Sequence, residues 1–476
     1  MTRNDVRKRV TKRGDSTKTE TERPTLNSDE LKKRPDLVAV DGILYDLKGL
    51  ANEHPGGSII LASGAYDASA LFHSMHPGRK PETSTLLKKY EVGIHRRREG
   101  DPRYTFDSAF ARDLIKSVRK AMRERGTSLY APSLFFLRIL IIAAATIFCE
   151  WKWATTGAWT WGVLCGVLHA QIGLSVQHDA SHGAISRTPW INAMLAYGAD
   201  WIGNSRWIWF QQHILWHHPH TNHQVLDPDA SSAEPFVVFS DYSKRGQHTP
   251  TPPKPSRWTA YQDRIVHLVL SFYGVSVVYN PYVLTMRHNE HVPEGIVRPG
   301  EFMDRQKTVA WSWRLFYLLR MVFAPWMSGA SLLTSLLLVN TVTGILLTFV
   351  FVVSHNFEGS DRDPSRLTET TTKSNQSNAI CWYRAQVETS CSYGGTIAMI
   401  LTGGLNFQIE HHVFPRICSW HYPFLKSTIR DCCKRHGVRY QYYPSLIHNV
   451  RSMLRYVRRV GIVLALSGSD SSGGSK

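Results

Sequence analysis

The sequence has few cysteines and no spacing that would organise them. Seven cysteines occur in 476 residues, at positions 149, 165, 381, 391, 418, 432 and 433, without a CxxC pair. This scarcity excludes a secreted disulfide scaffold and a cysteine zinc finger, and it favours a chain that faces the cytosol. The first residues contain no apolar run, which excludes a secretory signal peptide, and their acidic side chains argue against a mitochondrial transit peptide.

Acidic residues are fewer than basic ones. The 56 lysines and arginines exceed the 38 aspartates and glutamates, and the net charge is +18. Such an excess attracts nucleic acid, anionic lipid or an acidic protein. The basic residues flank apolar segments, and no recognised nucleic-acid-binding motif is present. The sequence therefore predicts membrane lipid as a partner and no binding of nucleic acid.

Composition divides the chain into five parts. Residues 1–36 are charged and almost free of apolar side chains, so they cannot offset the entropy cost of ordering and are predicted to form a disordered basic arm. Residues 37–96 read as a small compact module, and residues 97–131 as a charged connector. Residues 132–460 contain the apolar segments, and residues 461–476 are predicted to form a flexible tail.

Four apolar segments approach the length of about 20 residues that crosses a bilayer. They are Ser133–Cys149, Gly157–Gln177, Trp313–Met327 and Ser331–Ser354, arranged as two helical hairpins. Core helices of a soluble protein are the alternative, which these lengths disfavour. Ile265–Leu284 breaks at a proline and is predicted to be interfacial or buried. Two hairpins leave all soluble parts on one face, and the basic arm and basic C-terminal region predict that this face is cytosolic.

Histidine is abundant and clustered, with 22 residues in the chain. Three clusters, which we call the first, second and third histidine boxes, lie at 178–182 (HDASH), 213–218 (HILWHH) and 408–412 (QIEHH). The spacing of four residues in the first two boxes places two rings on one helical face. The even topology brings the three boxes and His355, at the end of the fourth segment, to the same face of the membrane.

The number of histidines indicates their role. A single pair is more often structural, but seven or eight together exceed the three or four ligands of one zinc and imply two metal ions. Nitrogen ligands with open positions suit redox iron that activates oxygen. The first box superficially resembles the HExxH motif of zinc proteases, but its second residue is Asp. We expect His169 to be structural, and His220, His223, Asp227 and Asp229 to orient metal ligands.

A second histidine feature lies in the N-terminal module. His54 begins an HPGG turn, whose glycines permit close approach of a flat cofactor, and His73 and His76 follow it. Two histidines on opposite walls can ligate one haem axially with no open position, which favours electron transfer over oxygen chemistry. Because an oxygen-activating iron site needs electrons, the two features support each other.

Taken together, these motifs resemble front-end fatty-acid desaturases, membrane di-iron enzymes with an N-terminal cytochrome b5 domain. The third box begins with Gln408 where other membrane desaturases carry His, a mark of the front-end group. The segments QVETSCSYGG (386–395) and LTGGLNFQIEHHVFP (401–415) most resemble those of delta-5 acyl desaturases of protists and algae. The resemblance implies a small α+β cytochrome b5-like domain, then an all-α integral membrane domain with four transmembrane helices and a cytosolic, histidine-rich di-iron cap.

The resemblance also implies site residues. Two irons are expected at His178, His182, His213, His217, His218, His411 and His412, with His355 as an additional ligand. Gln408 is expected to ligate, to act through water or only to pack. Haem b is expected at His54 and at His76 rather than His73. The second box has three residues between its first two histidines where many relatives have two, and we expect it to keep α-helical i,i+4 geometry.

The implied activity is an oxygen-dependent desaturase of the endoplasmic reticulum membrane, with its N-terminus and active site on the cytosolic face. It inserts a cis double bond between an existing double bond and the carboxyl end of a polyunsaturated acyl chain, delta-5 on twenty-carbon chains. The acyl carrier is coenzyme A or phospholipid, and electrons come from NADH-cytochrome b5 reductase. The alternatives are a delta-6 desaturase, a sphingoid-base desaturase, a hydroxylase, and a non-catalytic haem membrane anchor. We expect Trp201, Trp207, Trp209 and Trp216 to form an interfacial belt or to line the acyl tunnel.

Overall fold

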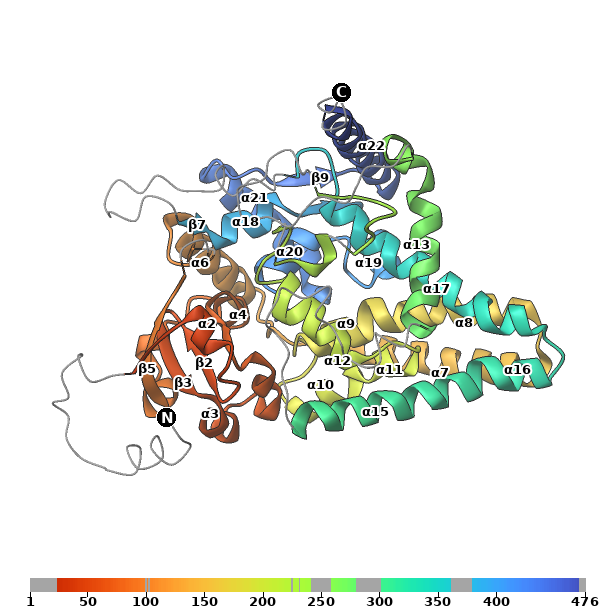
Figure 1. Cartoon of the computed structure of the whole chain (residues 1–476), viewed down its shortest axis with the longest axis horizontal. Coiled ribbons are helices and arrows are strands. Elements are labelled where there is room, and N and C mark those ends of the chain that lie inside the picture. The colour runs from red at the N-terminus through yellow and green to blue at the C-terminus, as the bar shows by residue number, and fades with distance from the viewer. Residues whose placement is uncertain are drawn as a thin grey trace, which may run out of the picture.

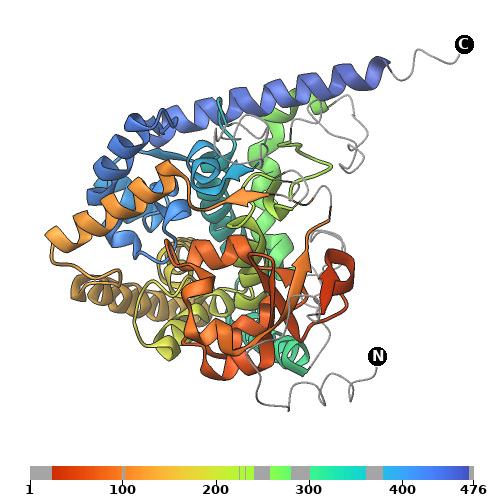
Figure 2. The same cartoon turned by 90° about the vertical axis from the view of Figure 1, so that its left-hand side faces the viewer.

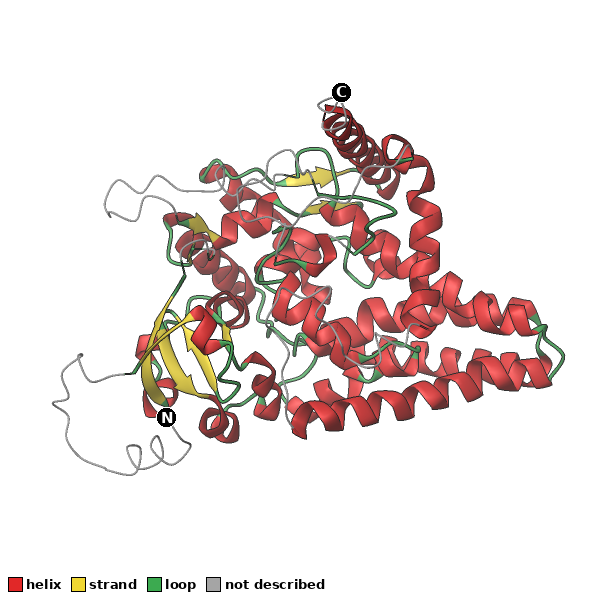
Figure 3. Ribbon diagram, viewed as in Figure 1, coloured by secondary structure: helices red, strands yellow, loops and turns green. Residues whose placement is uncertain are grey.

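The computed structural model of the chain describes residues 24–98, 101, 103–223, 226–230, 232–240, 258–279, 301–360 and 379–470. A small sheet domain lies beside a larger helical body, from which long helices project together in one direction (Figure 1). Most of the strand residues belong to the small domain (Figure 3). This division confirms an α+β domain followed by a helical one. Residues 1–23 of the predicted arm and 471–476 of the predicted tail lie outside the described residues.

The small domain is built on a five-stranded sheet with the order β1-β5-β3-β2-β4. Its strands are β1 (Thr25–Asn27), β2 (Leu37–Val40), β3 (Ile43–Asp46), β4 (Tyr66–Asp67) and β5 (Glu91–Arg96). Its helices are α2 (Ser28–Leu31), α3 (Leu47–Glu53), η2 (Gly57–Ser63), α4 (Ser69–Met75), η3 (Pro81–Thr83) and α5 (Thr85–Lys89). Asp41 and Gly42, both with positive φ, make the tight hairpin between β2 and β3.

The small domain begins earlier than the sequence predicts. β1 pairs in parallel with β5, from Thr25 opposite Ile94 to Asn27 opposite Arg96. Asn27 also caps α2, because its side chain accepts from backbone N–H groups while Glu30 bonds back to the Asn27 N–H. This reciprocal capping box stabilises a short helix whose Leu31 is buried. The prediction of disorder up to residue 36 is therefore wrong from residue 24 onward.

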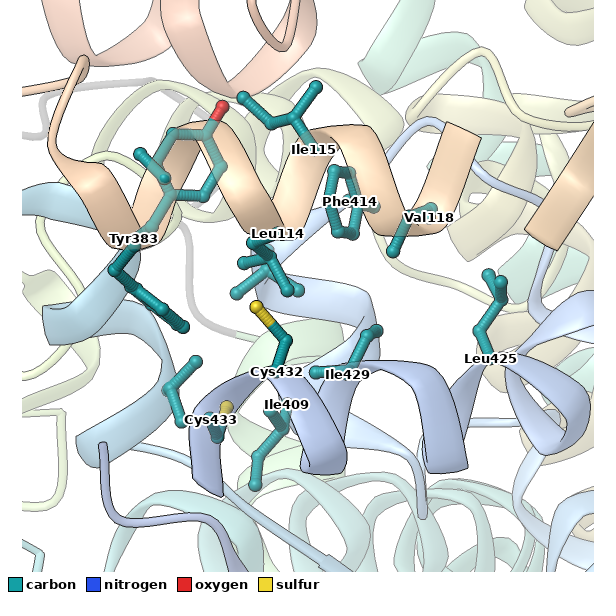
Figure 4. Packing of buried hydrophobic residues seen from close by; sticks show 14 of the residues in the cluster. Leu114, Ile115, Val118, Tyr383, Ile409, Phe414, Leu425, Ile429, Cys432 and Cys433 are labelled. Atoms are coloured by element: carbon teal, nitrogen blue, oxygen red, sulfur yellow. The ribbon is translucent and has the colours of Figure 1, made fainter. Parts of the chain in front are cut away.

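The predicted connector also contains ordered structure. Its strand β6 (Tyr104–Thr105) pairs with β7 (Ile380–Cys381), and its helix α6 (Ala109–Glu124) packs on α21 (Tyr422–Arg435). Apolar residues recur along one stripe of α6, which explains the packing. In Figure 4, Leu114 and Val118 of α6 lie over Ile429 of α21. Residues 104–124 thus belong to the helical body.

Three helices in the described part of the chain are long and apolar enough to cross a membrane. They are α7 (Ser133–Thr156), the run Trp159–Ser181, and α17 (Leu332–His355). The run consists of α8 (Trp159–Gln171), the π-helical η4 (Ile172–Gln177) and α9 (His178–Ser181). These helices correspond to three of the four predicted spans.

The fourth predicted span, Trp313–Met327, is helical but is not one of these three. It lies in a run of three helices, α15 (Glu301–Leu318), the π-helical η9 (Leu319–Phe323) and α16 (Ala324–Met327). This run lies alongside α7 in space (Figure 1). Arg314 and Arg320 interrupt its apolar character, and Arg320 forms an ion pair with Glu150 of α7. A count of four spans is therefore not confirmed.

Two further helices, α13 and α22, pack against α17 and against each other. α13 (Gln262–Tyr279) packs on α17 where Gly274 meets Gly344, and a Cβ on Gly274 would lie 2.2 Å from the Asn340 carbonyl oxygen. The interfacial or buried segment Ile265–Leu284 is thus a packed helix up to residue 279, and residues 280–284 lie outside the described residues. α22 (Leu446–Asp470) forms one long helix along the top of Figure 2. It continues past residue 461, where the sequence predicts a flexible tail.

Short elements form a cap at one end of the long helices. After the first box they are α10 (Pro189–Ala196), α11 (Gly198–Trp201), α12 (Arg206–Trp209), η5 (Phe210–His217), η6 (Pro228–Ala230) and η8 (Thr259–Tyr261). After α17 they are α18 (Trp382–Glu388), β8 (Cys391–Tyr393), α19 (Thr396–Thr402), α20 (Gln408–Val413), η11 (Ser419–His421) and β9 (Gln441–Tyr443). β8 and β9 pair in parallel. The cap therefore carries the second and third histidine boxes, and the first box lies at the adjoining end of the run Trp159–Ser181.

A glycine contact sets the distance between the first and third boxes. Gly403, which ends α19, has a φ of +66°, and a Cβ there would lie 2.5 Å from the Leu174 carbonyl oxygen of η4. The loop leading to the third box therefore rests directly on the backbone that precedes the first box.

Replacing Gly403 by alanine is expected to destabilise the protein markedly. The left-handed conformation costs a residue with a Cβ about 1–2 kcal/mol, and overpacking against the Leu174 backbone adds about 1–3 kcal/mol. Gly126→Ala is the matched control, because Gly126 has a φ of +64° with nothing within 4 Å of its added Cβ. Thermal unfolding in detergent should show a larger loss for Gly403→Ala, and equal losses would contradict the packing argument.

Candidate metal centre

The second histidine box lies on η5, which is π-helical. The backbone N–H of His218 donates to the His213 carbonyl, five residues back, at 3.0 Å. Because a π-turn has a longer repeat than an α-turn, residues five apart share one side. The Nε2 atoms of His213 and His218 therefore lie 3.1 Å apart. His217 also places a ring nitrogen within 4.8 Å of one of His213, and the two rings stack with centres 5.1 Å apart. The backbone of this box is thus π-helical and not α-helical as expected, although the rings four residues apart still face each other.

Four histidines from three segments form what we call the first histidine group. His178 and His182 come from α9 and its C-terminal end, His213 from η5, and His411 from α20. One ring nitrogen from each lies within 4.8 Å of the others, and all four residues are buried. The first box keeps α-helical spacing, since the His182 N–H donates to the His178 carbonyl at 3.2 Å.

Three more histidines form what we call the second histidine group. His217 of η5, His355 at the end of α17 and His412 of α20 place ring nitrogens within 4.8 Å of one another. His218 lies between the two groups, with its ring centre 4.5 Å from that of His182 and 4.4 Å from that of His412. The structure thus brings all eight predicted histidines together in two adjacent groups.

Gln408 lies beside the second histidine group. Its Nε2 is 3.0 Å from Nε2 of His355 and 3.3 Å from Nε2 of His412. Its side-chain oxygen is buried and has no hydrogen-bond partner among the described residues. Gln408 is therefore placed to contact whatever the second group holds.

Several other buried polar atoms of the groups have no hydrogen-bond partner among the described residues. They are Nε2 of His178, both ring nitrogens of His182, Nδ1 of His218 and Nε2 of His411. Leaving one such buried atom unpaired costs about 1–3 kcal/mol. Metal ions would satisfy these nitrogens, so the residues fit a bound metal.

Burial keeps most of these rings neutral. Burial, and then the neighbouring histidines, hold the pKa well below its usual value at His182, His213, His218, His411 and His412. Neutral imidazole is the form that binds metals. At His217, burial lowers the pKa, but the charges of Asp227 and Asp229 outweigh it and raise the pKa to about 9. A metal at His217 would therefore displace a proton.

The HPGG turn and the C-terminal end of α4 place two more histidines opposite each other. The ring centres of His54 and His76 lie 6.0 Å apart at 84°. A metal bound to both rings at about 2 Å would hold their centres about 6 Å apart, so this pair fits axial ligation of one iron. Nδ1 of His76 lies 3.0 Å from the Phe72 carbonyl, which leaves Nε2 for a ligand. Nε2 of His73 instead lies 2.8 Å from a carboxylate oxygen of Asp41.

Two protein-family models match this chain. The model described as "Fatty acid desaturase" covers residues 151–444, which is more than half of the chain. The chain belongs to the fatty acid desaturase family. The model described as "Cytochrome b5-like Heme/Steroid binding domain" covers residues 24–96 of this desaturase. The fusion implied by the sequence motifs is therefore confirmed, and the b5-like match begins where the described sheet domain begins.

Curated relatives match this desaturase over nearly its whole length. The "Acyl-lipid (7-3)-desaturase" of Diacronema lutheri is 30% identical, over 90% of this chain and 91% of the relative. The "Acyl-lipid (8-3)-desaturase B" of Dictyostelium discoideum is 28% identical, over 89% and 91%. The "Delta(5) fatty acid desaturase A" of the same organism is 25% identical, over 89% and 90%. The likeness to protist desaturases is thus confirmed.

Family membership makes the chain an oxidoreductase that desaturates fatty acyl groups with oxygen. The desaturase family implies iron, and the histidine groups are consistent with a metal site. The b5-like domain implies haem and electron transfer. The three long apolar helices indicate a membrane protein.

Carboxylates contact the second histidine group of the desaturase. Asp227, which is fully buried, places its carboxylate oxygens 3.0 and 3.1 Å from Nδ1 of His217. Asp229 lies 3.4 Å from the same nitrogen, with 46% of its side chain exposed. Both residues are where the sequence predicts them. A carboxylate on one ring nitrogen fixes the ring and leaves the other nitrogen for a metal.

Sequence reasoning missed several further partners, among them Gln386, Tyr422 and Thr221, whose Oγ1 lies 3.0 Å from Nδ1 of His412. Oε1 of Gln386 in α18 lies 3.0 Å from Nδ1 of His412, and the Tyr422 hydroxyl lies 3.2 Å from Nδ1 of His411. Gln386 is the first residue of the segment QVETSCSYGG, which resembles the family. That resemblance was the one sequence signal that could have pointed to Gln386. Tyr422 carries no such mark, because only the packing of α21 on α20 brings it to the ring.

Other histidines named from the sequence lie elsewhere. His220 is not a partner of the box residues as expected, because its ring nitrogens lie 3.0 Å from the Tyr66 hydroxyl and 3.1 Å from the Tyr104 hydroxyl. Nδ1 of His223 accepts from the backbone N–H of Leu226 at 3.2 Å. His169 lies 2.6 Å from Glu150, which agrees with a structural role.

The four tryptophans near the boxes differ in their surroundings. Trp207 and Trp216 are buried in a core shared with the haem domain, so the prediction of an interfacial belt is wrong for these two. Trp209 is half-buried and stacks on His213, with ring centres 4.3 Å apart. The half-buried Trp201 ring lies under the Arg320 guanidinium at 4.0 Å. For Trp201 and Trp209 a place in the belt or the acyl tunnel stays a prediction.

Proposed function

We propose that this chain is a front-end desaturase with two irons. The observation that carries the proposal is a pair of adjacent, buried histidine groups in one chain with a haem-type histidine pair. Among the described residues the first group has unpaired ring nitrogens, and the side-chain oxygen of Gln408 beside the second group is unpaired. His178, His182, His213 and His411 hold one iron, and His217, His355 and His412 the other. His218 lies between them and completes the set. Gln408 acts at the second iron, directly or through water.

The side chains position the metals and keep water away. The bound irons supply oxygen activation and removal of two hydrogens from the acyl chain. The overall reaction takes one CH2–CH2 pair, one O2, two electrons and two protons, and yields one CH=CH bond and two waters. Asp227, Gln386 and Tyr422 hold the histidine rings, so that the reacting pair meets a fixed site. A narrow apolar tunnel presents that pair to the site.

The electrons arrive through the haem domain. His54 and His76 hold haem b, and NADH-cytochrome b5 reductase reduces it. The enzyme lies in the endoplasmic reticulum membrane with its N-terminus and histidine cap on the cytosolic face, because basic residues gather in the arm and in the C-terminal region. The haem domain is the sheet domain, which begins at residue 24. The desaturase domain is the helical body.

The favoured substrate is a twenty-carbon acyl chain already unsaturated at carbon eight, with the new bond at carbon five. Support comes from Gln408 at the head of the third box and from the relatives named for Delta(5) activity. Other relatives carry the labels (7-3) and (8-3), so position varies among similar chains. The depth to which the acyl head enters sets the position, which no motif encodes. The carrier is a coenzyme A or phospholipid ester.

Feeding experiments test this assignment. Yeast expressing the chain is supplied separately with eighteen-, twenty- and twenty-two-carbon polyunsaturated acids, and mass spectrometry locates each new bond. We expect a bond at carbon five of the twenty-carbon acid. Extracts taken early in the time course are separated into coenzyme A and phospholipid fractions. The fraction in which the product appears first identifies the acyl carrier.

Other products would reassign the protein. A bond at carbon six of the eighteen-carbon acid indicates a delta-6 desaturase, and a bond at carbon four of the twenty-two-carbon acid indicates a third position. A hydroxyl product or a desaturated sphingoid base indicates another reaction on the same scaffold. Haem without non-haem iron and without any product indicates a haem membrane anchor.

Replacing Asp227 by asparagine is expected to weaken iron retention at the second histidine group. The amide keeps the shape of the carboxylate but removes the charge that holds His217, and changes of this kind cost about 10–100-fold in metal affinity. Asp229→Asn is the matched control. We expect a smaller effect from it, because the Asp229 carboxylate lies farther from His217, at 3.4 Å, and its side chain is about half exposed. Iron retained during chelator titration measures both, and equal retention in the Asp227 variant and the unmodified chain would contradict the role.

A further inference from the structure

Aromatic rings lead away from the haem pocket by direct contact. The Phe72 ring stacks on His76 with centres 4.8 Å apart, and its centre is 5.3 Å from that of His73. His73 in turn stacks on Phe106 at 3.9 Å with an angle of 16° between the planes. His73 thus serves as a stacked neighbour of Phe106, while His76 faces the cofactor.

The series continues into the helical body. Phe106, in the segment between β6 and α6, lies 6.2 Å from the ring of Trp382. Trp382 begins α18 and is fully buried, and its indole N–H donates to the Pro219 carbonyl at 3.0 Å. Pro219 directly follows His218 in the chain. A continuous set of packed rings and one hydrogen bond therefore joins the His76 ring to the backbone of the second box.

The elements that carry these rings are neighbours in the fold. α6 lies between α4 of the small domain and α18 of the helical body at the left of Figure 1, and α6 and α18 are in contact. The third-box region also reaches the haem pocket, because the Arg416 guanidinium lies 3.4 Å from the Met75 carbonyl. Burial first, and the Arg416 charge in addition, lower the pKa of His76 to about 4. The His54–His76 pair thus lies near the interface rather than on the far face.

We propose that Phe72, His73, Phe106 and Trp382 form the electron-transfer route from the haem to the di-iron centre, with Phe106 and Trp382 as the bridging residues between the domains. This inference rests on the proposed function. In each transfer one ferrous haem becomes ferric and one non-haem ferric ion becomes ferrous, and two transfers supply the two electrons of a turnover. The rings are neither oxidised nor reduced themselves. They fill the space between the two metal sites with packed and bonded atoms. Electronic coupling falls less steeply with distance through such atoms than through an empty gap.

Haem reoxidation measures the route without measuring product. The full-length holoenzyme is reduced anaerobically, mixed with oxygenated buffer and acyl substrate, and the ferrous haem absorption is followed in a stopped-flow instrument. Phe106→Leu and Trp382→Leu are expected to slow reoxidation several-fold, with haem content and reduction by the reductase unchanged. Trp382→Phe keeps a ring and is expected to recover most of the rate.

Phe110→Leu is the matched control, since it removes the same ring four residues further along the chain, at the start of α6 and in the core of α6 and α21. It is expected to reoxidise at the normal rate. A normal rate in Phe106→Leu overturns the proposal and leaves the Tyr66–Trp216 contact, with ring centres 4.8 Å apart, as the route. If Trp382→Leu loses non-haem iron, Phe106→Leu alone decides, because the ring contacts of Phe106 among the described residues are with His73, Tyr104 and Trp382 and not with a box histidine. An unmodified chain without non-haem iron would instead refute the proposed function.

Discussion

Replacing His182 or His412 by alanine is expected to remove at least one non-haem iron and to abolish desaturation, while the haem absorption stays unchanged. His182 has both ring nitrogens buried and unpaired among the described residues. His412 is one of only three rings in the second histidine group. Even changes to residues behind a ligand cost about 10–100-fold in affinity or activity, so loss of a ligand itself should exceed that.

Metal analysis normalised to haem measures this effect. The ligand arithmetic predicts about three irons per unmodified chain, haem included. His267→Ala is the control, because His267 lies on an exposed part of α13 and belongs to neither histidine group. Full activity and full iron in the His182 or His412 variant, or zinc in place of non-haem iron, would refute the di-iron assignment.

Replacing His76 by alanine is expected to eliminate the haem absorption band entirely. The His54–His76 ring separation of 6.0 Å fits a single metal between them, and Phe72 already occupies the other nitrogen of His76. Without the axial ligand we expect no haem to be held, so that the proposed di-iron centre receives no electrons through the b5-like domain. Non-haem iron should remain, which separates this variant from the His182 and His412 variants.

His73→Ala is the discriminating companion of His76→Ala. His73 is engaged by Asp41 and stacked on Phe106, so its removal should leave the haem spectrum intact. A variant at His73 that loses haem, with His76→Ala retaining it, would reassign the axial ligand. Absorption spectra of the purified proteins, scaled to protein concentration, are sufficient to decide.

The histidine boxes and the HPGG turn could be found from sequence because their residue types and spacing are local. The division of the second box between two groups could not, because it depends on a π-helix over Phe210–His217. No residue in HILWHH marks an i→i+5 bond. Leu215 and Trp216 of this π-helix pack in a core shared with the haem domain, and Gln386 and Tyr422 reach the third box from α18 and α21. Both features depend on tertiary contacts, which a local sequence pattern does not record.

The boundaries were predicted less well than the motifs. Disorder up to residue 36 followed from overall charge, but the Asn27–Glu30 capping box was a local signal for α2. The fourth span was predicted from apolar content alone. Arg320 pairs with Glu150 inside the helical body, so a charge that weakens the apolar pattern is neutralised by a contact no sequence pattern reveals.

The buried core shared by the haem domain and the second box changes how the two halves can behave in time. Leu50 and Tyr66 of the sheet domain are packed in one cluster with Leu215 and Trp216 of η5. A donor fixed in this way neither diffuses nor competes with free cytochrome, so its effective concentration is constant and the supply of the second electron is independent of enzyme dilution. Turnover per chain should therefore not change as the protein is diluted in the membrane.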